Sequence, residues 1–385
     1  MAESATPSNV IGAYGPWASN IVGEGPGALS FRNDAFDDVN AWRDIARGRL
    51  QACLAVPNTG SMPRAEVVDQ WSYDGLEVEF LRWQLPYGPA TEAYFVKPEG
   101  ASGELPGVLA LHDHGGNKYF GKRKITRLFD DWHPLMVEHQ DNYYGGVAWA
   151  NEVAKRGYGV LVPDAFPFAS RRVLVGDVAG RVGGDLTDDD SEASDHIQAY
   201  NRWAADHEST MAKSLFCAGT TWPGVFLSED QRALDVLCGR DDIDADRVGC
   251  GGLSGGGMRT VFLAGADDRI QCAVCVGMMT TWQDFLLNKS HTHTWMVYVP
   301  LLSQDFDYPE ILGLRAPLPT LVQNDEDDQL FTMPGMKRAD DILTEVYAKA
   351  DAADRYQCSF YPGPHKFDLP MQDEAFCWFD RWLAA

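Results

Sequence analysis

A serine set between glycines, Gly252-Leu253-Ser254-Gly255-Gly256, is the most reactive pattern in the chain. A short apolar run at residues 248–251, predicted to be a strand, comes directly before it, and a helical pattern follows. A sharp turn from a strand into a helix exposes the serine hydroxyl, and flanking glycines relieve the crowding there. The start of a helix also favours developing negative charge. The pattern therefore predicts a nucleophilic serine at position 254.

Two further residues could complete the chemistry, because a serine nucleophile needs a base and the base needs an orienting carboxylate. His365 lies in the loop predicted between the last strand, residues 356–361, and the last helix. Asp328 follows another predicted strand, residues 319–323. The order Ser254, Asp328, His365, with each residue in a loop after a strand, is more specific than the glycine-flanked serine alone. Together the three predict acyl transfer in two steps.

The elements that must position these residues can be read from the spacing of apolar residues. Short apolar runs alternate with helical patterns, the runs near 106–111, 158–164, 247–251, 270–276, 319–322 and 356–361 and the helices near 148–156, 230–238, 258–264, 335–349 and 371–383. Such alternation is typical of parallel βαβ units. Before them, residues 65–97 alternate apolar and polar side chains between turn signals, which predicts antiparallel strands. The predicted fold class is α/β, with a central, mostly parallel sheet flanked by helices.

The length of 385 residues allows one large domain with insertions. We expect an N-terminal arm over residues 1–62, with a helix at 35–54, and a catalytic domain over residues 63–385. Two segments at about 165–224 and 278–316 interrupt the alternation, and loops this long are usually lids or binding loops, or are partly disordered. Four residues in these segments are candidates for substrate binding, with core or lid packing as the alternative: Trp222, Trp282, His291 and His293.

From about residue 65 onward, the chain resembles the dienelactone-hydrolase and acetyl-xylan-esterase-like branch of the α/β-hydrolase superfamily. The matching pieces are Leu-His-Asp-His-Gly-Gly at 111–116, residues 157–164 and 242–249, the turn at Ser254, and Tyr-Pro-Gly-Pro-His at 361–365. The resemblance implies an α/β-hydrolase fold and a carboxylic ester hydrolase, with acetyl or carbohydrate esters as candidate substrates. Dienelactone hydrolases proper use a cysteine nucleophile, so Ser254 places this chain nearer the esterases.

The resemblance also bears on the acid and the oxyanion hole. The family usually has glycine where Asp325 stands and the acid three positions later, at Asp328, while the acidic cluster leaves Asp327 as an alternative. The N–H of Gly255, directly after the nucleophile, is the first expected oxyanion donor. By analogy with the family, the second is the N–H of His114.

Three other interpretations of these motifs remain open. A serine peptidase or amidase of the same fold would use the same three residues. A metal-dependent hydrolase could use two His-x-His pairs, His112 with His114 and His291 with His293, because alternation along a strand puts each pair on one face. A non-catalytic binding module is the third reading, although such modules usually lose one of the three reactive residues. We expect neither a metal nor another cofactor.

The charge and the cysteines bear on partners and location. The chain has 56 acidic and 32 basic residues, a formal charge of −24, which repels nucleic acid and anionic lipid. It contains no apolar stretch long enough to span a membrane, and residues 1–7 lack the features of a secretory signal. Cys272 and Cys275 lie three apart in a predicted strand, so they point to opposite faces and make a poor disulfide or metal pair. The expected partner is a small-molecule ester, the expected location is cytoplasmic, and the oligomeric state is left open.

Overall fold

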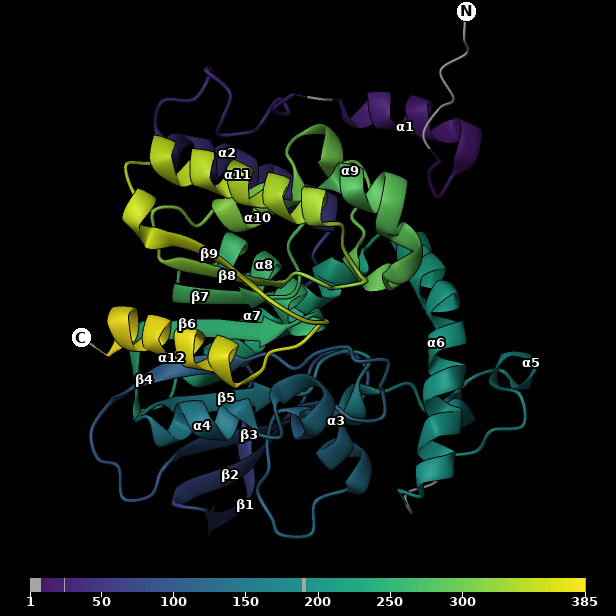
Figure 1. Ribbon diagram of the computed structural model, residues 1–385. Helices are drawn as coiled ribbons and strands as arrows, with labels where there is room; N and C mark the ends of the chain where they lie inside the picture. The colour runs from purple at the N-terminus through teal and green to yellow at the C-terminus, as the bar shows by residue number, and fades with distance from the viewer. Residues whose placement is uncertain (1–7, 24, 189–191, 385) are drawn as a thin grey trace, which may run out of the picture.

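The computed structural model describes residues 8–23, 25–188 and 192–384. The start of the predicted arm, residues 1–7, and two members of the acidic run, residues 189–190, lie outside this part. Within it, nine strands form a single sheet (Figure 1). The strands are β1 Glu66–Tyr73, β2 Leu76–Trp83, β3 Thr91–Pro98, β4 Leu105–Ala110, β5 Gly159–Pro163, β6 Ile243–Leu253, β7 Ile270–Val276, β8 Thr320–Asp325 and β9 Tyr356–Tyr361.

The sheet is mixed, as the sequence predicts. Its strand order is β1-β2-β3-β5-β4-β6-β7-β8-β9. The first three strands and the β3–β5 pair are antiparallel, whereas every neighbouring pair from β5 through β4 to β9 is parallel. The carboxyl ends of parallel strands meet at one edge of a sheet, and active sites of open α/β sheets form there.

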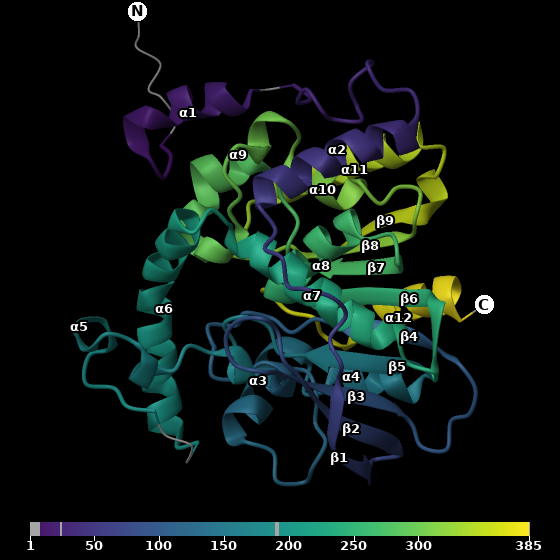
Figure 2. The ribbon, with the colours of Figure 1, turned by 180° about the vertical axis from the view of Figure 1, so that it is seen from behind.

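Helices cover both faces of the sheet. They are α1 Gly15–Val22, α2 Val39–Leu54, α3 Pro134–Tyr144, α4 Trp149–Lys155, α5 Gly180–Gly183, α6 Ser194–Cys217, α7 Trp222–Cys238, α8 Gly255–Ala266, α9 Trp282–Asp284, α10 Tyr308–Gly313, α11 Met333–Lys349 and α12 Leu369–Leu383. In Figure 1, α4 and α12 lie in front of the sheet, and Figure 2 shows α2 and α7 on the opposite face. Helix α8 packs directly on β6 and β7.

Strand alternation sends side chains into two cores, one on each face. On β4, Val108 and Ala110 pack in the core beneath α3, α4 and α12, whereas Leu109 packs in the core beneath α2, α7 and α8. On β7, Cys272 and Cys275 likewise belong to different cores. The predicted opposite orientation of these two thiols is therefore confirmed. All eight cysteines lie in the described part of the chain, and none is paired with another.

The two interrupting segments contain more regular structure than the sequence predicts. The first segment contains the 24-residue helix α6, which lies beside the sheet on the right of Figure 1. Helix α7 begins at Trp222, near the end of this segment. The second holds α9, a π-helical turn at Phe285–Lys289, several 3-10 turns and α10. The expectation of long loops is thus wrong for much of both segments.

Candidate active site

Ser254 stands at the junction of β6 and α8, in a backbone conformation that only a tight turn imposes. Its φ is 57° and its ψ is −115°, outside the ordinary regions for a residue with a side chain. Such a conformation costs of order 1–3 kcal/mol and persists only where surrounding structure holds it. Here the Ser254 N–H donates to the Val276 carbonyl on β7, at 2.8 Å, and its carbonyl accepts from Met258 N–H on α8, also at 2.8 Å.

The flanking glycines are required by close backbone approach. A Cβ atom on either Gly252 or Gly256 would collide with the carbonyl oxygen of Leu111, in the loop after β4. The strand–serine–helix turn is thereby pressed against that loop. This contact brings Gly255 next to His114, since a Cβ on Gly255 would lie 2.8 Å from the backbone nitrogen of His114.

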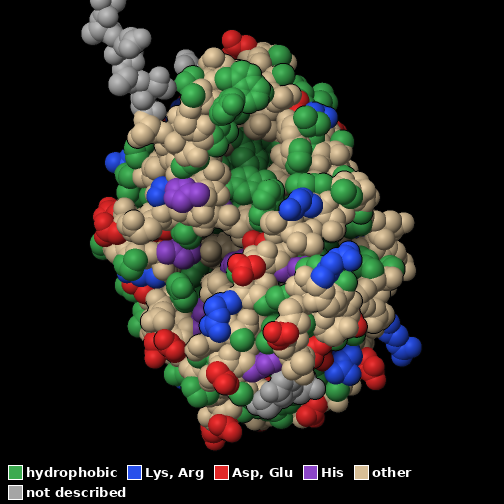
Figure 3. All heavy atoms as spheres, turned by 90° about the vertical axis from the view of Figure 1, so that its right-hand side faces the viewer, with side chains coloured by type: hydrophobic (Ala, Val, Ile, Leu, Met, Phe, Trp, Pro, Cys, Tyr) green, Lys and Arg blue, Asp and Glu red, His purple; other side chains and the backbone are tan. Residues whose placement is uncertain are grey.

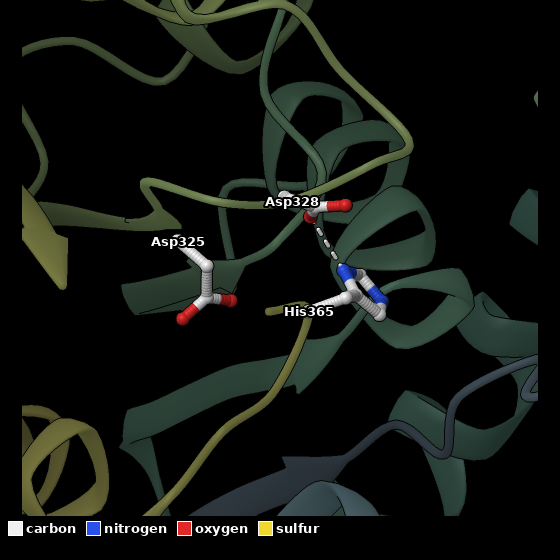
Figure 4. Close-up of side chains that lie close together, drawn as sticks. All are labelled: Asp325, Asp328 and His365. Carbon is white, nitrogen blue, oxygen red and sulfur yellow. Dashed lines mark hydrogen bonds and ion pairs between the residues drawn. The ribbon is translucent and has the colours of Figure 1, made fainter. Parts of the chain in front are cut away.

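His365 and Asp328 meet in the loops after β9 and β8 (Figure 4). The Nδ1 atom of His365 lies 2.6 Å from Oδ2 of Asp328, whose side chain is buried. A carboxylate only accepts hydrogen bonds, so Nδ1 carries the proton in this pair and the lone pair of a neutral ring sits on Nε2. Nε2 is buried and has no hydrogen-bond partner within the described residues. The ring is therefore arranged to accept a proton at Nε2.

The two neighbouring acidic residues have different surroundings. Asp327 is exposed, and its carboxylate accepts the N–H of Gly363 at 3.2 Å. Asp325 is fully buried, and its Oδ2 accepts the N–H of Lys366 at 3.0 Å. Burial raises the pKa of the Asp325 carboxyl to about 7. Of the three carboxylates, Asp328 is the one that hydrogen-bonds to His365.

A buried charge cluster fixes the loop that carries His114. The Nζ atom of Lys124 donates to the carbonyls of Asp113 and His114, each at 2.8 Å. The Asp113 carboxylate is bonded to His139 Nε2 at 3.1 Å and to the hydroxyl of Tyr144. Burial would raise the pKa of Asp113, but His139 and Lys124 hold that pKa well below its usual range. Two charge-assisted bonds on adjacent carbonyls restrict how the loop's peptide groups can rotate.

The His114 side chain is held from the opposite side by helix α6. Its Nε2 lies 3.0 Å from Oε1 of Glu208, which also binds Lys118 Nζ at 2.6 Å. Burial lowers the pKa of His114 despite this carboxylate. Helix α6 thus contributes a charged side chain to the same loop.

Two cavities meet at Ser254. The larger, of about 340 Å³, is lined by Ser254 and His365, and by Gly115, Gly116, Tyr143, Leu253, Thr292 and Leu330 among others. The smaller, of about 40 Å³, is lined by Ser254, Gly255 and side chains of α8 but not by His365. On the face shown in Figure 3, histidine side chains gather around a hollow in the surface.

Only one of the four predicted substrate-binding residues reaches these cavities. His293 lines both, and burial lowers its pKa to about 4, so its ring is neutral at pH 7. Trp222 and Trp282 are buried in the core beneath α7 and α8, and His291 is exposed to solvent. The two tryptophans therefore pack in the core, which is the alternative to substrate binding given for them above.

The His-x-His pairs do not converge on a common point with further ligands. In the described part of the chain, the one group of three whose donor atoms lie within 4.8 Å of one another is Asp325, Asp328 and His365. His365 uses Nδ1 for its hydrogen bond to Asp328, and the Asp325 carboxylate is hydrogen-bonded to neither residue (Figure 4); the Asp325 carbonyl accepts the Asp328 N–H at 3.3 Å. His112 and His114 instead bond to the Asp113 carbonyl and to Glu208.

Several residues of the site are not identified by the sequence analysis: Asp113, Lys124, His139, Tyr144 and Glu208. They come from the loop after β4, from α3 and from α6. Asp113 lies between His112 and His114, the first His-x-His pair, and this position is a signal that could have identified it. The others carry no spacing signal, because only the tertiary fold brings their side chains together.

The chain is similar in sequence to a protein of Bacillus subtilis (strain 168) named "Putative hydrolase YtaP". The two are 29% identical over 309 residues, covering 80% of this chain and 88% of the relative. No family model matches the chain.

The solved structures that resemble the fold include the following two. One is a "putative acetyl xylan esterase" from Bacteroides fragilis NCTC 9343, with a TM-score of 0.64 and 16% identity over 89% of this chain and 80% of the other. The second is a glucuronoyl esterase from Solibacter usitatus, with a TM-score of 0.61 and 13% identity over 92% and 96%. With the mixed sheet and the Ser254 turn, these similarities show that the chain has the α/β-hydrolase fold. No described helix is long and apolar enough to cross a membrane.

Proposed function

We propose that this protein is a serine esterase that cleaves a carboxylic ester by two-step acyl transfer. The observation that carries the proposal is the bond between His365 Nδ1 and Asp328, which leaves Nε2 unpartnered at a cavity that Ser254 also lines. In the first step Nε2 takes the proton of the Ser254 hydroxyl as the oxygen attacks the ester carbonyl. The same proton then passes to the leaving alcohol. In the second step a water molecule, deprotonated by His365, releases the acid.

The negative charge that develops on the carbonyl oxygen is stabilised by two backbone donors, the N–H groups of Gly255 and His114. Supporting this assignment, Gly255 is the first residue of α8 and abuts the backbone nitrogen of His114. The first N–H groups of a helix have no intrahelical partner and are free to donate. Loss of one such donor typically raises the activation barrier by about 3–4 kcal/mol.

The names of the similar proteins suggest which substrates to test first. Acetylated sugars and sugar-acid esters follow from the two structural neighbours, and a small-molecule ester fits a cavity of about 340 Å³. A peptidase or amidase remains the second reading of the same site. Paired acetyl esters and aminoacyl amides with the same leaving group separate the two activities.

The deciding experiment combines labelling and turnover. We expect a fluorophosphonate to label the wild type and to leave Ser254→Ala unlabelled, with hydrolysis of 4-nitrophenyl acetate lost by at least about 10⁴-fold. Ser359→Ala, which removes a hydroxyl bonded to Glu374 on the β9–α12 side, is the matched control and should retain activity. Full labelling of Ser254→Ala, or unchanged hydrolysis, would disprove the proposal.

A further inference from the structure

We propose that the small cavity beside Ser254 binds the acyl part of the ester and selects a short acyl group with a hydroxyl next to its carbonyl, such as a glycolyl group. This inference rests on the proposed esterase function and names its substrate class. It follows from the place of the cavity, its size, and the buried polar groups on its wall.

The position of the base decides which cavity takes which part of the substrate. The leaving alcohol must receive a proton from His365, so it occupies the larger cavity, which His365 lines. The acyl group then points to the other side of Ser254, where Gly255 lines the smaller cavity and not the larger, while His114 lines both. A volume of about 40 Å³ admits a group of two or three heavy atoms and no long chain.

Arg259 supplies an unused hydrogen-bond donor. It lies four residues after Gly255 on α8, hence on the same helix face, and it lines the small cavity. Its Nε donates to Asp230 Oδ2 at 3.0 Å, and its Nη2 donates to the other oxygen of that carboxylate. Both side chains are 2% exposed. The remaining nitrogen, Nη1, is buried with no hydrogen-bond partner among the described residues.

His112 supplies an unused acceptor on the same cavity wall. Its Nδ1 lies 3.0 Å from the Asp113 carbonyl, which only accepts, so Nδ1 carries the proton. Burial lowers the pKa of His112 to about 3, with Arg259 adding to the effect, so the ring stays neutral. Its Nε2 then presents a lone pair, and this atom is also buried and unpartnered. The rest of the wall is mostly apolar, with Met258, Met278, Met296, Val297, Phe168 and Phe226.

On this mostly apolar wall, the donor Arg259 Nη1 and the acceptors His112 Nε2 and His293 Nε2 match a hydroxyl, which both accepts and donates. A methyl group of the same size would leave Arg259 Nη1 and His112 Nε2 without hydrogen-bond partners in a buried site. Sites built to bond a substrate hydroxyl can reject the analogue that lacks it by several orders of magnitude. A carboxylate fits less well, because it would face the lone pair of His112 and lie near the charge of Asp230.

The test compares two esters of equal size and identical leaving group, 4-nitrophenyl glycolate and 4-nitrophenyl propionate. The quantity is the ratio of their kcat/KM values, corrected by the ratio of their hydroxide-catalysed rates. We expect the wild type to favour the glycolate by at least tenfold after this correction. The paired variant Arg259→Met/Asp230→Leu removes the donor without leaving a buried charge, and the corrected ratio should fall about tenfold or more.

A matched control removes another buried ion pair away from the cavity. Arg171 and Glu229 are joined at 2.6 Å, both side chains are buried, and neither lines the small cavity. Arg171→Met/Glu229→Leu should leave the corrected ratio unchanged. If the Arg259 variant does not fold, His112→Leu removes the acceptor instead and should lower the ratio in the same direction.

The outcomes separate the inference from the function on which it rests. If the wild type hydrolyses both esters with a corrected ratio near one, or if both cavity variants keep the wild-type ratio, the inference is wrong and the esterase proposal stands. If the wild type hydrolyses neither ester and fluorophosphonate does not label Ser254, the proposed function fails, and the inference fails with it.

Discussion

Asp328 and Asp327 are adjacent acids of which one hydrogen-bonds to His365 and the other to the backbone of Gly363. We expect Asp328→Asn to lower kcat by about 10⁴-fold, because an amide in place of the carboxylate favours the wrong imidazole tautomer. Asp327→Asn is the matched control and should change kcat by less than a few fold. Steady-state rates with 4-nitrophenyl acetate measure both. A larger loss in Asp327→Asn than in Asp328→Asn would reverse the assignment.

Asp325 makes stability depend on pH near neutrality. Its pKa in the folded protein is raised by burial to about 7, above the value of 3.8 for a free side chain. The folded state therefore binds this proton more tightly, and the stability it contributes is lost as pH rises from about 4 through about 7. Between pH 5.5 and 8.5 the loss is about 2 kcal/mol, at 1.36 kcal/mol per unit over about 1.5 units below the folded pKa.

Asp325→Asn should abolish that loss, since an amide cannot ionise but its oxygen can still accept from Lys366 N–H. Urea unfolding at the two pH values measures the effect as the difference between variant and wild type. We expect the variant to gain stability relative to the wild type at pH 8.5. The exposed neighbour changed in the same way, Asp327→Asn, should show no such dependence. An identical pH dependence in wild type and Asp325→Asn would contradict the assignment.

At the residue scale, the order and the spacing of reactive residues predict which residues take part in the site. They do not predict which of these side chains contact one another. Ser254 and His365 are identified because glycines and loop positions mark them. The choice between Asp327 and Asp328 depends on which of two successive side chains turns inward, and adjacent acids give no periodicity to read. Trp222 and Trp282 show that the sequence also fails to separate substrate-binding from core aromatic residues, because an aromatic residue near a predicted loop can equally belong to the core.

At the scale of elements, the 3-10 turn Lys122–Lys124 allows a direct test of how the loop after β4 is held. Lys124→Met keeps the length of the side chain but removes the bonds to the Asp113 and His114 carbonyls. We expect kcat to fall by about 10²–10³-fold, as for loss of an oxyanion donor, because the His114 N–H is no longer fixed.

The matched control for Lys124 lies two residues earlier in the same turn. Lys122 is also buried, but its Nζ binds Asp164 at 2.7 Å rather than the loop. Lys122→Met should destabilise the protein while changing kcat per labelled active site much less. Equal losses of kcat in the two variants would show that the effect is a general consequence of removing a buried lysine.

Elements whose buried face is apolar are predicted well, and those whose buried face is polar are missed. The parallel strands and helices α2, α8, α11 and α12 bury apolar side chains at regular spacing. Helix α6 also buries one face at helical spacing, but that face includes His207 and Glu208. Helix α3 buries His139 and Gln140 in the same way. A pattern that counts only apolar residues cannot detect these helices, and both supply contacts to the His114 loop.

For the whole molecule, the parallel direction of strands β4 to β8 explains why the site can be assembled from distant segments. Strands β4, β6 and β8 end at the same edge, so residues near 113, 254 and 328 meet although more than 200 positions separate the first from the last. The alternation of elements predicts this sheet. The insertions that shape the cavities follow no repeat, so the substrate pocket is the part of the molecule that the sequence predicts least.

The N-terminal arm provides a test of how the molecule is held together. Trp42 on α2 is fully buried; its ring stacks on Phe31 at 4.8 Å between centroids, and its Nε1 donates to the Leu29 carbonyl at 2.7 Å. Helix α2 packs on α7 and α8, so this side chain belongs to the core next to α8, the helix that follows Ser254. Trp42→Ala should lower the free energy of unfolding by about 3–5 kcal/mol, through lost burial and the cavity left behind.

Ile45 on the same helix is 54% exposed, so Ile45→Ala is the matched control and should change stability by less than about 0.5 kcal/mol. Urea unfolding measures both variants, and fluorophosphonate labelling counts the folded sites. Under native conditions kcat/KM per labelled site should equal the wild-type value, because Trp42 lines neither cavity. A Trp42→Ala protein as stable as Ile45→Ala would mean that α2 lies on the rest of the molecule without sharing its core.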